Sequence, residues 1–371
     1  MPEMKVDFAN LQHQYQLYKA EIDARIQAVL DKSNYIMGEE VAELEQKLEK
    51  FTGAKHAITC SNGTDALVLA LMAMDIQPGD EVITTPFTFI STGESIAFLK
   101  ATPVFVDIDP LTYNINPVQI ESAITEKTKA IMPVSLYGQP ADMDEINAIA
   151  KKHNLKVIMD GAQSFGATYK GQSEVHHGDF YTTSFFPAKP LGCYGDGGAV
   201  FTNNDEYAEK IKMLRVHGQN KRYHHKYIGM GGRLDTIQAA VLLAKLPHYA
   251  KEVELRQQVA SNYAEQLKPI LETSKQVKAI PLIKSDRTSV YAQYTLRVSD
   301  RDALQGKLKE QGIPTAVHYP MPLHLQECFE YLGYKQGDFP VAEVASEEVM
   351  SLPMNAFLAF DVIEYVYSKL R

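Results

Sequence analysis

Four short apolar runs alternate with helical segments between residues 82 and 160, and this alternation narrows the choice of fold. The runs cover residues 82–85, 104–107, 130–135 and 156–160, and the helical segments lie near 92–100, 117–124 and 142–152. Short buried strands that alternate with helices are typical of a mostly parallel sheet with helices on both faces. Ligands bind such sheets at the carboxyl ends of the strands. Functional side chains are therefore expected directly after these runs.

A single lysine, Lys189, stands between two prolines and ahead of a glycine-rich turn. Pro187 and Pro190 fix φ on either side of it, and glycines at four later positions allow close approach of the backbone to a ligand: 192, 195, 197 and 198. The segments 180–184 and 198–202 are predicted to be strands. A loop lysine is usually an ordinary solvated residue. A lysine held at a strand edge can instead lose its proton and attack a carbonyl carbon, as Schiff-base formation requires.

Polar residues end two of the predicted strands near this lysine. Asp160 ends the run 156–160 and is followed by Gly161, Ala162 and Gln163, and Ser184 ends the run 180–184. A hydroxyl at a strand end is a natural phosphate ligand. A carboxylate at a strand end and a lysine one strand further on are the groups that pyridoxal 5'-phosphate needs, at its ring nitrogen and its aldehyde.

Two further segments could serve the same cofactor. The small polar residues of 60–65, which include Gly63 and Thr64, lead into an apolar helix predicted at 66–74, and the N–H groups at a helix start face an anion. The alternative is a plain helix cap, which is compatible with phosphate binding. Phe89 follows the run 82–85, where an aromatic residue is most often part of the core.

Seven motifs, in order along nearly the whole chain, resemble the DegT/StrS sugar-nucleotide aminotransferases. They are Asn62-Gly-Thr64, Phe87-Thr-Phe89, Asp160-Gly-Ala-Gln163, Ser184 to Lys189, Gly195-Asp-Gly-Gly198, Arg233-Leu-Asp-Thr-Ile-Gln-Ala-Ala240 and His318-Tyr-Pro-Met-Pro-Leu-His324. The resemblance implies an aspartate-aminotransferase-like fold (fold type I), an α/β/α sandwich with a mostly parallel sheet and a smaller C-terminal α+β domain. Within the family the chain resembles most the enzymes that aminate a UDP-linked 3-keto uronic acid for bacterial surface-polysaccharide (O-antigen) synthesis.

The resemblance implies a role for each cofactor-binding residue. Lys189 is expected to hold pyridoxal 5'-phosphate covalently and to act as general base and acid in the proton shift. Asp160 is expected to keep the ring nitrogen protonated, and Gln163 to bond the ring hydroxyl. The remaining implied contacts are those of the phosphate and of the ring face: Gly63, Thr64 and Ser184 for the phosphate, and Phe89 for the ring.

Four residues match the positions that surround the sugar in the 3-keto uronate enzymes: His217, Arg233, His318 and Tyr319. The implied reaction moves an amino group from L-glutamate, which leaves as 2-oxoglutarate, to C3 of UDP-2-acetamido-2-deoxy-3-keto-glucuronate. The alternative acceptor is C4 of a UDP-linked 4-keto acetamido sugar. An arginine fork beside a histidine suits the uronate carboxylate. The competing explanation is that Arg233 pairs with Asp235 in its own helix.

The family also implies a homodimer in which both chains build each active site. The basic loop 217–226 is then expected to cross to the other subunit and meet substrate. One motif departs from the family, because the usual Asn-x-Arg is Gly231-Gly232-Arg233 here. The asparagine that would reach the phosphate of the neighbouring subunit is missing, and the sequence does not identify its replacement.

Other classes of function are disfavoured. A nicotinamide-dependent oxidoreductase would need Gly-x-Gly-x-x-Gly after an early strand, which this chain lacks, and a regulatory or scaffold protein would leave Lys189 idle. Dehydratases of this fold have histidine at the lysine position. The net charge of -9 argues against a nucleic-acid or anionic-membrane partner. The two histidine pairs, at 176–177 and 224–225, lack suitably spaced carboxylate or cysteine ligands, so no metal is expected.

The chain carries neither a run of about 18 apolar residues nor a signal peptide, which predicts a cytoplasmic protein without a membrane span. Its 3 scattered cysteines agree with a reducing compartment. Residues 1–247 are predicted to form a large cofactor-binding domain that includes an N-terminal helix at 11–31. The apolar helix that starts at Arg233 is predicted to end at Pro247, and residues 248–371 to form the small C-terminal domain.

Overall fold

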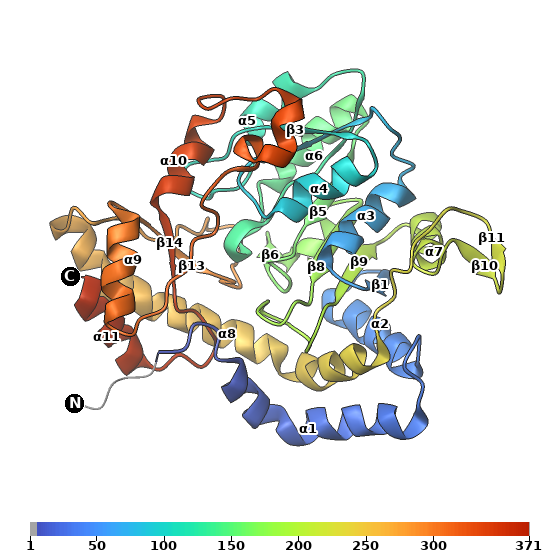
Figure 1. Ribbon diagram of the computed structural model, residues 1–371, viewed down its shortest axis with the longest axis horizontal. Helices are drawn as coiled ribbons and strands as arrows, with labels where there is room; N and C mark the ends of the chain where they lie inside the picture. Colours follow the sequence, from blue (N-terminus) through green and yellow to red (C-terminus); the bar gives the residue numbers. More distant parts are fainter. Residues whose placement is uncertain (1–5, 371) are drawn as a thin grey trace.

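The computed structural model describes residues 6–370, and a seven-stranded sheet lies at the centre of this part of the chain (Figure 1). The strand order is β1-β9-β8-β5-β4-β2-β3. β9 runs antiparallel to both of its neighbours, and the other paired strands are parallel, so the predicted mostly parallel sheet is confirmed. The strands are β1 (His56–Cys60), β2 (Glu81–Thr84), β3 (Thr102–Phe105), β4 (Thr128–Ile131), β5 (Lys156–Asp160), β8 (Phe180–Ser184) and β9 (Gly198–Thr202).

Helices cover both faces of this sheet because neighbouring residues of each strand point to opposite sides. In β5, Ile158 packs into the core that contains α3 (Gly63–Ala73), α4 (Ile90–Phe98) and α7 (Asp205–Leu214). Val157 and Met159 pack into the core on the other face, with α2 (Glu39–Thr52), α6 (Met143–His153) and the first part of the long helix α8 (Thr236–Thr273). The predicted α/β/α sandwich is confirmed.

The prediction that Pro247 ends a helix is wrong, since α8 runs through it as one helix of 38 residues. A proline inside a helix removes one hydrogen bond and costs about 3 kcal/mol. Here the proline ring lies on the exposed side, while Leu243, Leu246 and Tyr249 on the other side are buried in the large core. Burial of that apolar side offsets the cost of the proline.

A smaller body lies beyond the middle of α8. Its sheet has the order β12-β13-β14, with both pairs antiparallel, and α9 (Arg301–Glu310), α11 (Phe360–Leu370) and the end of α8 cover it. The three strands are β12 (Val277–Ala279), β13 (Tyr294–Val298) and β14 (Val349–Leu352). The division at residues 247 and 248 falls inside α8, whose contacts change from the large core at Tyr249 to the small core at Val259. The two domain boundaries stay a prediction.

The segment between α9 and β14 crosses back onto the large body. Its helix α10 (Pro340–Glu348) shares an apolar cluster with β3, in which Leu323, Phe329 and Phe339 pack with Phe87 and Phe105. Asp107 fixes the start of α10, because its two carboxylate oxygens accept hydrogen bonds from the N–H groups of Val341 and Ala342, each at 2.9 Å. This crossing carries residues 318 and 319 towards the carboxyl ends of the large sheet.

The remaining elements lie at the periphery. The N-terminal helix α1 (Leu11–Lys32) runs along α8 and buries Ile22 and Val29 (Figure 1). A hairpin of β10 (Gln219–Lys221) and β11 (His224–His225) projects from the body beside α7. Among residues 6–370, no helix combines the length and the apolar character that crossing a bilayer requires. The short elements are α5 (Pro117–Ile120), β6 (Thr168–Tyr169), β7 (Gln172–Ser173), η1 (Glu121–Ala123), η2 (Leu136–Gly138), η3 (Glu174–His176), η4 (Leu323–Leu325) and η5 (Glu327–Leu332).

Candidate active site

Asp160 occupies the carboxyl end of the central strand β5, and its side chain is almost fully buried. Its Oδ2 atom accepts a hydrogen bond of 2.7 Å from the Thr92 hydroxyl of α4, and its Oδ1 atom accepts one of 3.2 Å from the N–H of Ala162. Burial raises the pKa of Asp160, and Thr92, Ala162 and the charge of Lys189 oppose that effect. A buried carboxylate of this kind is suited to holding a cationic N–H group.

Lys189 lies in the loop between β8 and β9, where the backbone folds back on itself. Its N–H donates to the carbonyl of Phe186 at 2.8 Å. A Cβ atom at Gly192 would lie 2.6 Å from the carbonyl oxygens of both Phe186 and Pro187, so the close packing of this loop requires glycine there. Burial lowers the pKa of Lys189, and the Asp160 carboxylate opposes the effect. A larger share of neutral amine is what a nucleophilic lysine needs.

Gln163 and Tyr319 bring the two bodies of the chain together beside Asp160. Gln163 Oε1 accepts a hydrogen bond from the N–H of Tyr137 at 2.8 Å, and its Nε2 atom donates to the Tyr319 hydroxyl at 3.1 Å. The Tyr137 hydroxyl donates to the carbonyl of His318. Burial, together with the charge of Lys189, lowers the pKa of His318 to about 4, and its Nδ1 atom lies 2.9 Å from the Ser351 hydroxyl. Predicted substrate residues 318 and 319 thus lie with the predicted cofactor residues.

The start of α3 and the end of β8 approach each other closely. A Cβ atom at Gly63 would lie 2.7 Å from the Cβ of Ser184. Asn62 caps the helix, since its side-chain oxygen accepts a hydrogen bond from the N–H of Asp65 at 2.7 Å, and this cap is compatible with the predicted phosphate binding. The N–H groups of Gly63 and Thr64, which precede Asp65, have no partner within the helix and are available to an anion. The Thr64 hydroxyl points to the Ser91 hydroxyl, 2.7 Å away.

Phe89 is placed beside these groups as the residue that precedes α4. Its ring is 53% exposed, so it is not part of the core. The ring centre lies 6.0 Å from that of Tyr319. An exposed ring next to Tyr319, at the start of the helix whose Thr92 bonds Asp160, is available to stack on a planar ligand.

His217 and Arg233 form a separate group. A Cβ atom at Gly231 would lie 3.2 Å from the His217 ring and 3.8 Å from Arg233 Nη2. The His217 ring therefore fills the space beside Gly231, the position where the family usually has asparagine. Arg233 Nε is buried without a hydrogen-bond partner, and within residues 6–370 the side chain makes no ion pair with Asp235. The segment that carries Gly232 and Arg233 lies next to the start of α3, because the Ser61 N–H donates to the carbonyl of Gly232 at 3.1 Å. Among the described residues, no hydrogen bond or ring contact links His217 or Arg233 to Lys189.

Sequence reasoning did not identify Thr92, Ser91 and Tyr137. Thr92 lies three residues after Phe89 and one turn from Thr88, whose hydroxyl is 2.9 Å from its own. The sequence feature that could have identified Thr92 is a polar residue on a helix that packs against the sheet. Tyr137 follows the predicted strand 130–135, so the rule that ligands bind at the carboxyl ends of strands would have selected it.

The donor set fits pyridoxal 5'-phosphate. A buried carboxylate, a lysine whose pKa is lowered, an exposed aromatic ring and a helix start with neighbouring hydroxyls match the ring nitrogen, aldehyde, ring face and phosphate of that molecule. Within the described residues no group of three potential metal ligands occurs.

Comparisons with known proteins agree with this chemistry. The model of the DegT/DnrJ/EryC1/StrS aminotransferase family matches residues 16–371. The chain is 51% identical to UDP-2-acetamido-2-deoxy-3-oxo-D-glucuronate aminotransferase of Pseudomonas aeruginosa, over 95% of this chain and 96% of the relative. It is 41% identical to UDP-N-acetyl-3-dehydro-alpha-D-glucosamine 3-aminotransferase of Acidithiobacillus ferrooxidans, over 100% of this chain and 96% of the relative.

Two solved structures share the fold. DesV of S. venezuelae, in complex with a ketimine intermediate, has a TM-score of 0.95 and 36% identity, with 99% of this chain and 98% of that chain covered. NtdA of Bacillus subtilis, with bound cofactor PMP, has a TM-score of 0.91 and 29% identity, with 99% of this chain and 84% of that chain covered.

Proposed function

This chain belongs to the DegT/DnrJ/EryC1/StrS aminotransferase family, whose members depend on pyridoxal phosphate, and we propose that it aminates C3 of UDP-2-acetamido-2-deoxy-3-keto-glucuronate with L-glutamate as donor. The predicted resemblance and the predicted cofactor are confirmed. The cofactor, when bound, withdraws electrons from the carbon that carries the transferred nitrogen.

In this proposal Lys189 has two tasks and each other residue has one. Lys189 Nζ would hold the cofactor covalently and would then act as general base and acid, taking up the proton from the substrate carbon and giving it back. Asp160 holds the ring nitrogen protonated, while Gln163 bonds the ring hydroxyl. The remaining residues bind the phosphate and the ring face: Gly63, Thr64 and Ser184 for the phosphate, and Phe89 for the ring.

Arg233 carries the choice of substrate. Its guanidinium has a buried donor without a partner, and a carboxylate is the group that such a fork binds best. The uronate has a carboxylate at C6, where the corresponding glucose derivative has a hydroxymethyl group. His217, His318 and Tyr319 are proposed to line the same sugar site. The relative with 51% identity is named for the uronate, which supports this choice.

We also propose a homodimer whose active sites are shared. The hairpin β10–β11 projects from the body, and Tyr223 at its tip is 77% exposed, with Ile228 beyond it 91% exposed (Figure 1). Exposed apolar side chains on a projecting hairpin are suited to packing against a second chain. The predicted cytoplasmic location and the predicted use of the product in surface polysaccharide (O-antigen) remain proposals.

Borohydride reduction tests the role of the lysine. The purified protein should be yellow, and reduction followed by peptide mapping should find the cofactor on Lys189. Lys189→Ala should bind cofactor without catalysing transfer. A label on a different lysine would contradict the assignment.

A pair of substrates tests the role of Arg233. UDP-2-acetamido-3-keto-glucuronate and its 3-keto glucose counterpart differ only at C6, so the second is a matched control. Arg233→Met should lose about a hundredfold or more in kcat/KM on the uronate, because a buried carboxylate contact is worth about 2 to 5 kcal/mol, and lose little on the control. If a UDP-linked 4-keto acetamido sugar reacts faster and Arg233→Met keeps that rate, the alternative acceptor at C4 is correct and the aminotransferase assignment stands.

A further inference from the structure

A second buried carboxyl group, Glu174, lies beneath the cofactor-binding residues. It starts η3 directly after β7, and it is only 1% exposed. Its own N–H donates to the carbonyl of Ala167 at 3.1 Å, which ties it to the segment that follows the Asp160 strand. None of the tasks in the proposed function uses this residue.

Each oxygen of Glu174 accepts a hydrogen bond from a serine of a different turn. Oε1 accepts from the Ser135 hydroxyl and Oε2 accepts from the Ser164 hydroxyl at 2.5 Å. Ser164 belongs to the Asp160 turn (residues 160–164), which carries Asp160 and Gln163. Ser135 belongs to the Tyr137 turn (residues 135–140), whose Tyr137 N–H holds Gln163. One carboxylate therefore joins the two turns that orient Gln163.

The Asp160 turn and the Tyr137 turn are also joined directly, by a backbone hydrogen bond. The N–H of Ser135 donates to the carbonyl of Asp160 at 3.0 Å. Tyr181 supports the other side, since its hydroxyl donates to the carbonyl of Gly161 at 3.1 Å. A Cβ atom at Gly161 would lie 2.1 Å from the Tyr181 ring, so this position admits only glycine.

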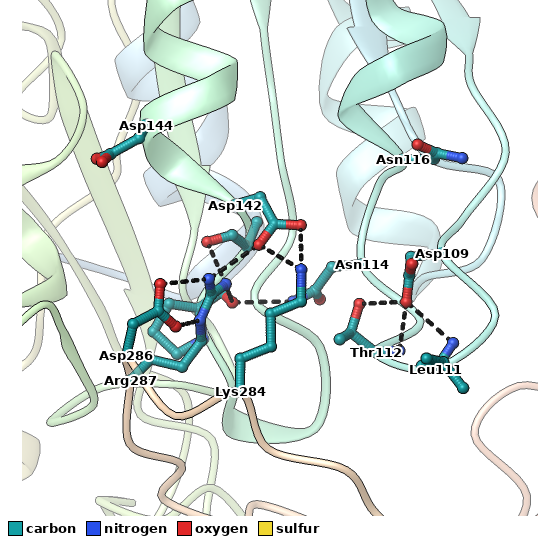
Figure 2. A network of polar contacts seen from close by, with 12 residues as sticks. Asp109, Leu111, Thr112, Asn114, Asn116, Asp142, Asp144, Lys284, Asp286 and Arg287 are labelled. Atoms are coloured by element: carbon teal, nitrogen blue, oxygen red, sulfur yellow. Dashed lines mark hydrogen bonds and ion pairs between the residues drawn. The ribbon is translucent and has the colours of Figure 1, made fainter.

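A second network fixes the far end of the Tyr137 turn, as Figure 2 shows. The Asn114 amide donates to the carbonyls of Gln139 and Pro140, at 3.0 and 3.1 Å, and its oxygen accepts from the N–H of Leu136 at 2.9 Å. Arg287 donates to the carbonyls of Pro140 and Ala141, each at 2.9 Å. Backbone bonds hold Ser135 against Asp160, and this network holds the far end of the Tyr137 turn. Glu174 then ties the Ser164 end of the Asp160 turn, next to Gln163, to the Tyr137 turn.

The charges around Glu174 come from three elements. Asp160 on β5 repels it, Arg287 attracts it, and the hydroxyl of Tyr181 on β8 faces it. Burial raises the pKa of Glu174 to about 7, and the two serine hydroxyls oppose that effect. A carboxyl group in this range is an anion only in part at neutral pH.

We propose that Glu174 is a positioning residue for the cofactor: through one hydroxyl on each turn it sets the spacing of Asp160 and Gln163 beneath the pyridine ring, and its negative charge helps to keep the ring nitrogen protonated. This inference rests on the proposed assignment of Asp160 and Gln163 to the ring. It needs no contact between Glu174 and the cofactor.

Three variants test the inference, with readouts other than activity. Glu174→Gln keeps the shape and removes the charge. Ser164→Ala removes one tether and only reduces the charge, because the Ser164 hydroxyl opposes the rise in the pKa of Glu174. Glu45→Gln is the matched control, because Glu45 also bonds a hydroxyl (Thr59) and a buried arginine (Arg215), but at the far edge of the sheet. For each variant we would measure the dissociation constant of pyridoxal 5'-phosphate, the pH midpoint of its visible absorption when bound, and the urea midpoint of the apoprotein.

The expected result separates positioning from general stability. Glu174→Gln should weaken cofactor binding about tenfold, since a hydrogen bond to a charged group is lost, and should move the absorption midpoint to lower pH by about half a unit or more. Ser164→Ala should weaken binding in the same direction and move the midpoint to lower pH by less than Glu174→Gln does, because part of the Glu174 charge remains. Glu45→Gln should lower only the urea midpoint.

Two results would overturn the inference. The first is wild-type cofactor affinity and pH midpoint in Glu174→Gln, and the second is an equal loss of affinity in Glu45→Gln. If Glu174→Gln does not fold, unchanged affinity in Ser164→Ala would overturn it equally. A wild-type protein that binds no cofactor, or binds it on a different lysine, would instead contradict the proposed function.

Discussion

The Thr92 hydroxyl donates a hydrogen bond to the Asp160 carboxylate at 2.7 Å, and both side chains are buried. Thr92 lies on α4 and Asp160 at the end of β5, so the contact joins the helix that begins after Phe89 to the strand that carries the proposed partner of the ring nitrogen. Thr88 extends it, because its hydroxyl lies 2.9 Å from that of Thr92. The Thr92 hydroxyl therefore stabilises the Asp160 anion, and the Thr88 hydroxyl lies next to that of Thr92.

Thr92→Val should reduce kcat by about ten- to a hundredfold while the cofactor stays bound. Loss of a hydrogen bond to a buried charge costs about 1.5 to 3 kcal/mol, and the pKa of Asp160 should rise further without it. Asp160→Asn should lose about two decades or more. Thr88→Val is the control, since it leaves the bond to Asp160 intact, and it should lose less than about threefold. A fully active Thr92→Val enzyme would show that this hydroxyl does not support the carboxylate.

Mixed subunits test whether the basic loop 217–226, which contains the projecting hairpin, acts on the partner chain. His217→Ala and Lys189→Ala should each be inactive, and mixed dimers should regain part of the activity if one chain supplies Lys189 and the other His217. Co-expression with two different affinity tags and a standard transfer assay measures this. Mixed dimers that form and remain inactive would place His217 in the same site as the Lys189 of its own chain.

Arg287 should be a main contributor to stability, as the network in Figure 2 indicates. Its side chain is 3% exposed and pairs with Asp142 and Asp286 at 2.9 and 2.7 Å. Arg287→Met should lower the free energy of unfolding by about 3 kcal/mol, because the buried Asp142 carboxylate and the carbonyls of Pro140 and Ala141 lose their donor. Lys284→Met shares the partner Asp142 but alters a side chain that is 37% exposed, and it should cost about 1 kcal/mol or less. Urea titration compares the two, and equal losses would contradict the assigned weight of Arg287.

The sequence was sufficient for the parts of the site that depend on neighbours along the chain. Asp160 ends an apolar run and Lys189 precedes a glycine-rich turn, and both signals survive without knowledge of the fold. Glu174 could not be found in this way. It stands in a segment with two histidines that resembles a solvated turn, and one of its two hydrogen-bond partners, Ser135, lies 39 residues away.

Pro247 is the opposite case, because here a local signal is misleading. Proline disfavours a helix interior, and this preference predicts a helix end at residue 247. The helix continues because Leu243, Leu246 and Tyr249 bury their side chains in the large core on the side away from the proline. Tertiary packing outweighs a local preference when a whole apolar face would otherwise be exposed.

His318 should make the apoprotein sensitive to acid. Its pKa is about 4 in the folded chain, below the ordinary value of 6.5, because the ring is buried and lies near Lys189. The neutral ring therefore contributes stability above pH 6.5 that is lost as the pH falls towards about 4, by about 3 kcal/mol at most. Glu174, whose folded pKa is raised, changes with the opposite sign, so only a difference curve isolates the histidine. His318→Asn, which cannot take up a proton in this range, should lose less stability than the wild type between pH 6.5 and 4.5 in urea titrations. Parallel curves for the two proteins would show that His318 is already protonated, or exposed, in the folded apoprotein.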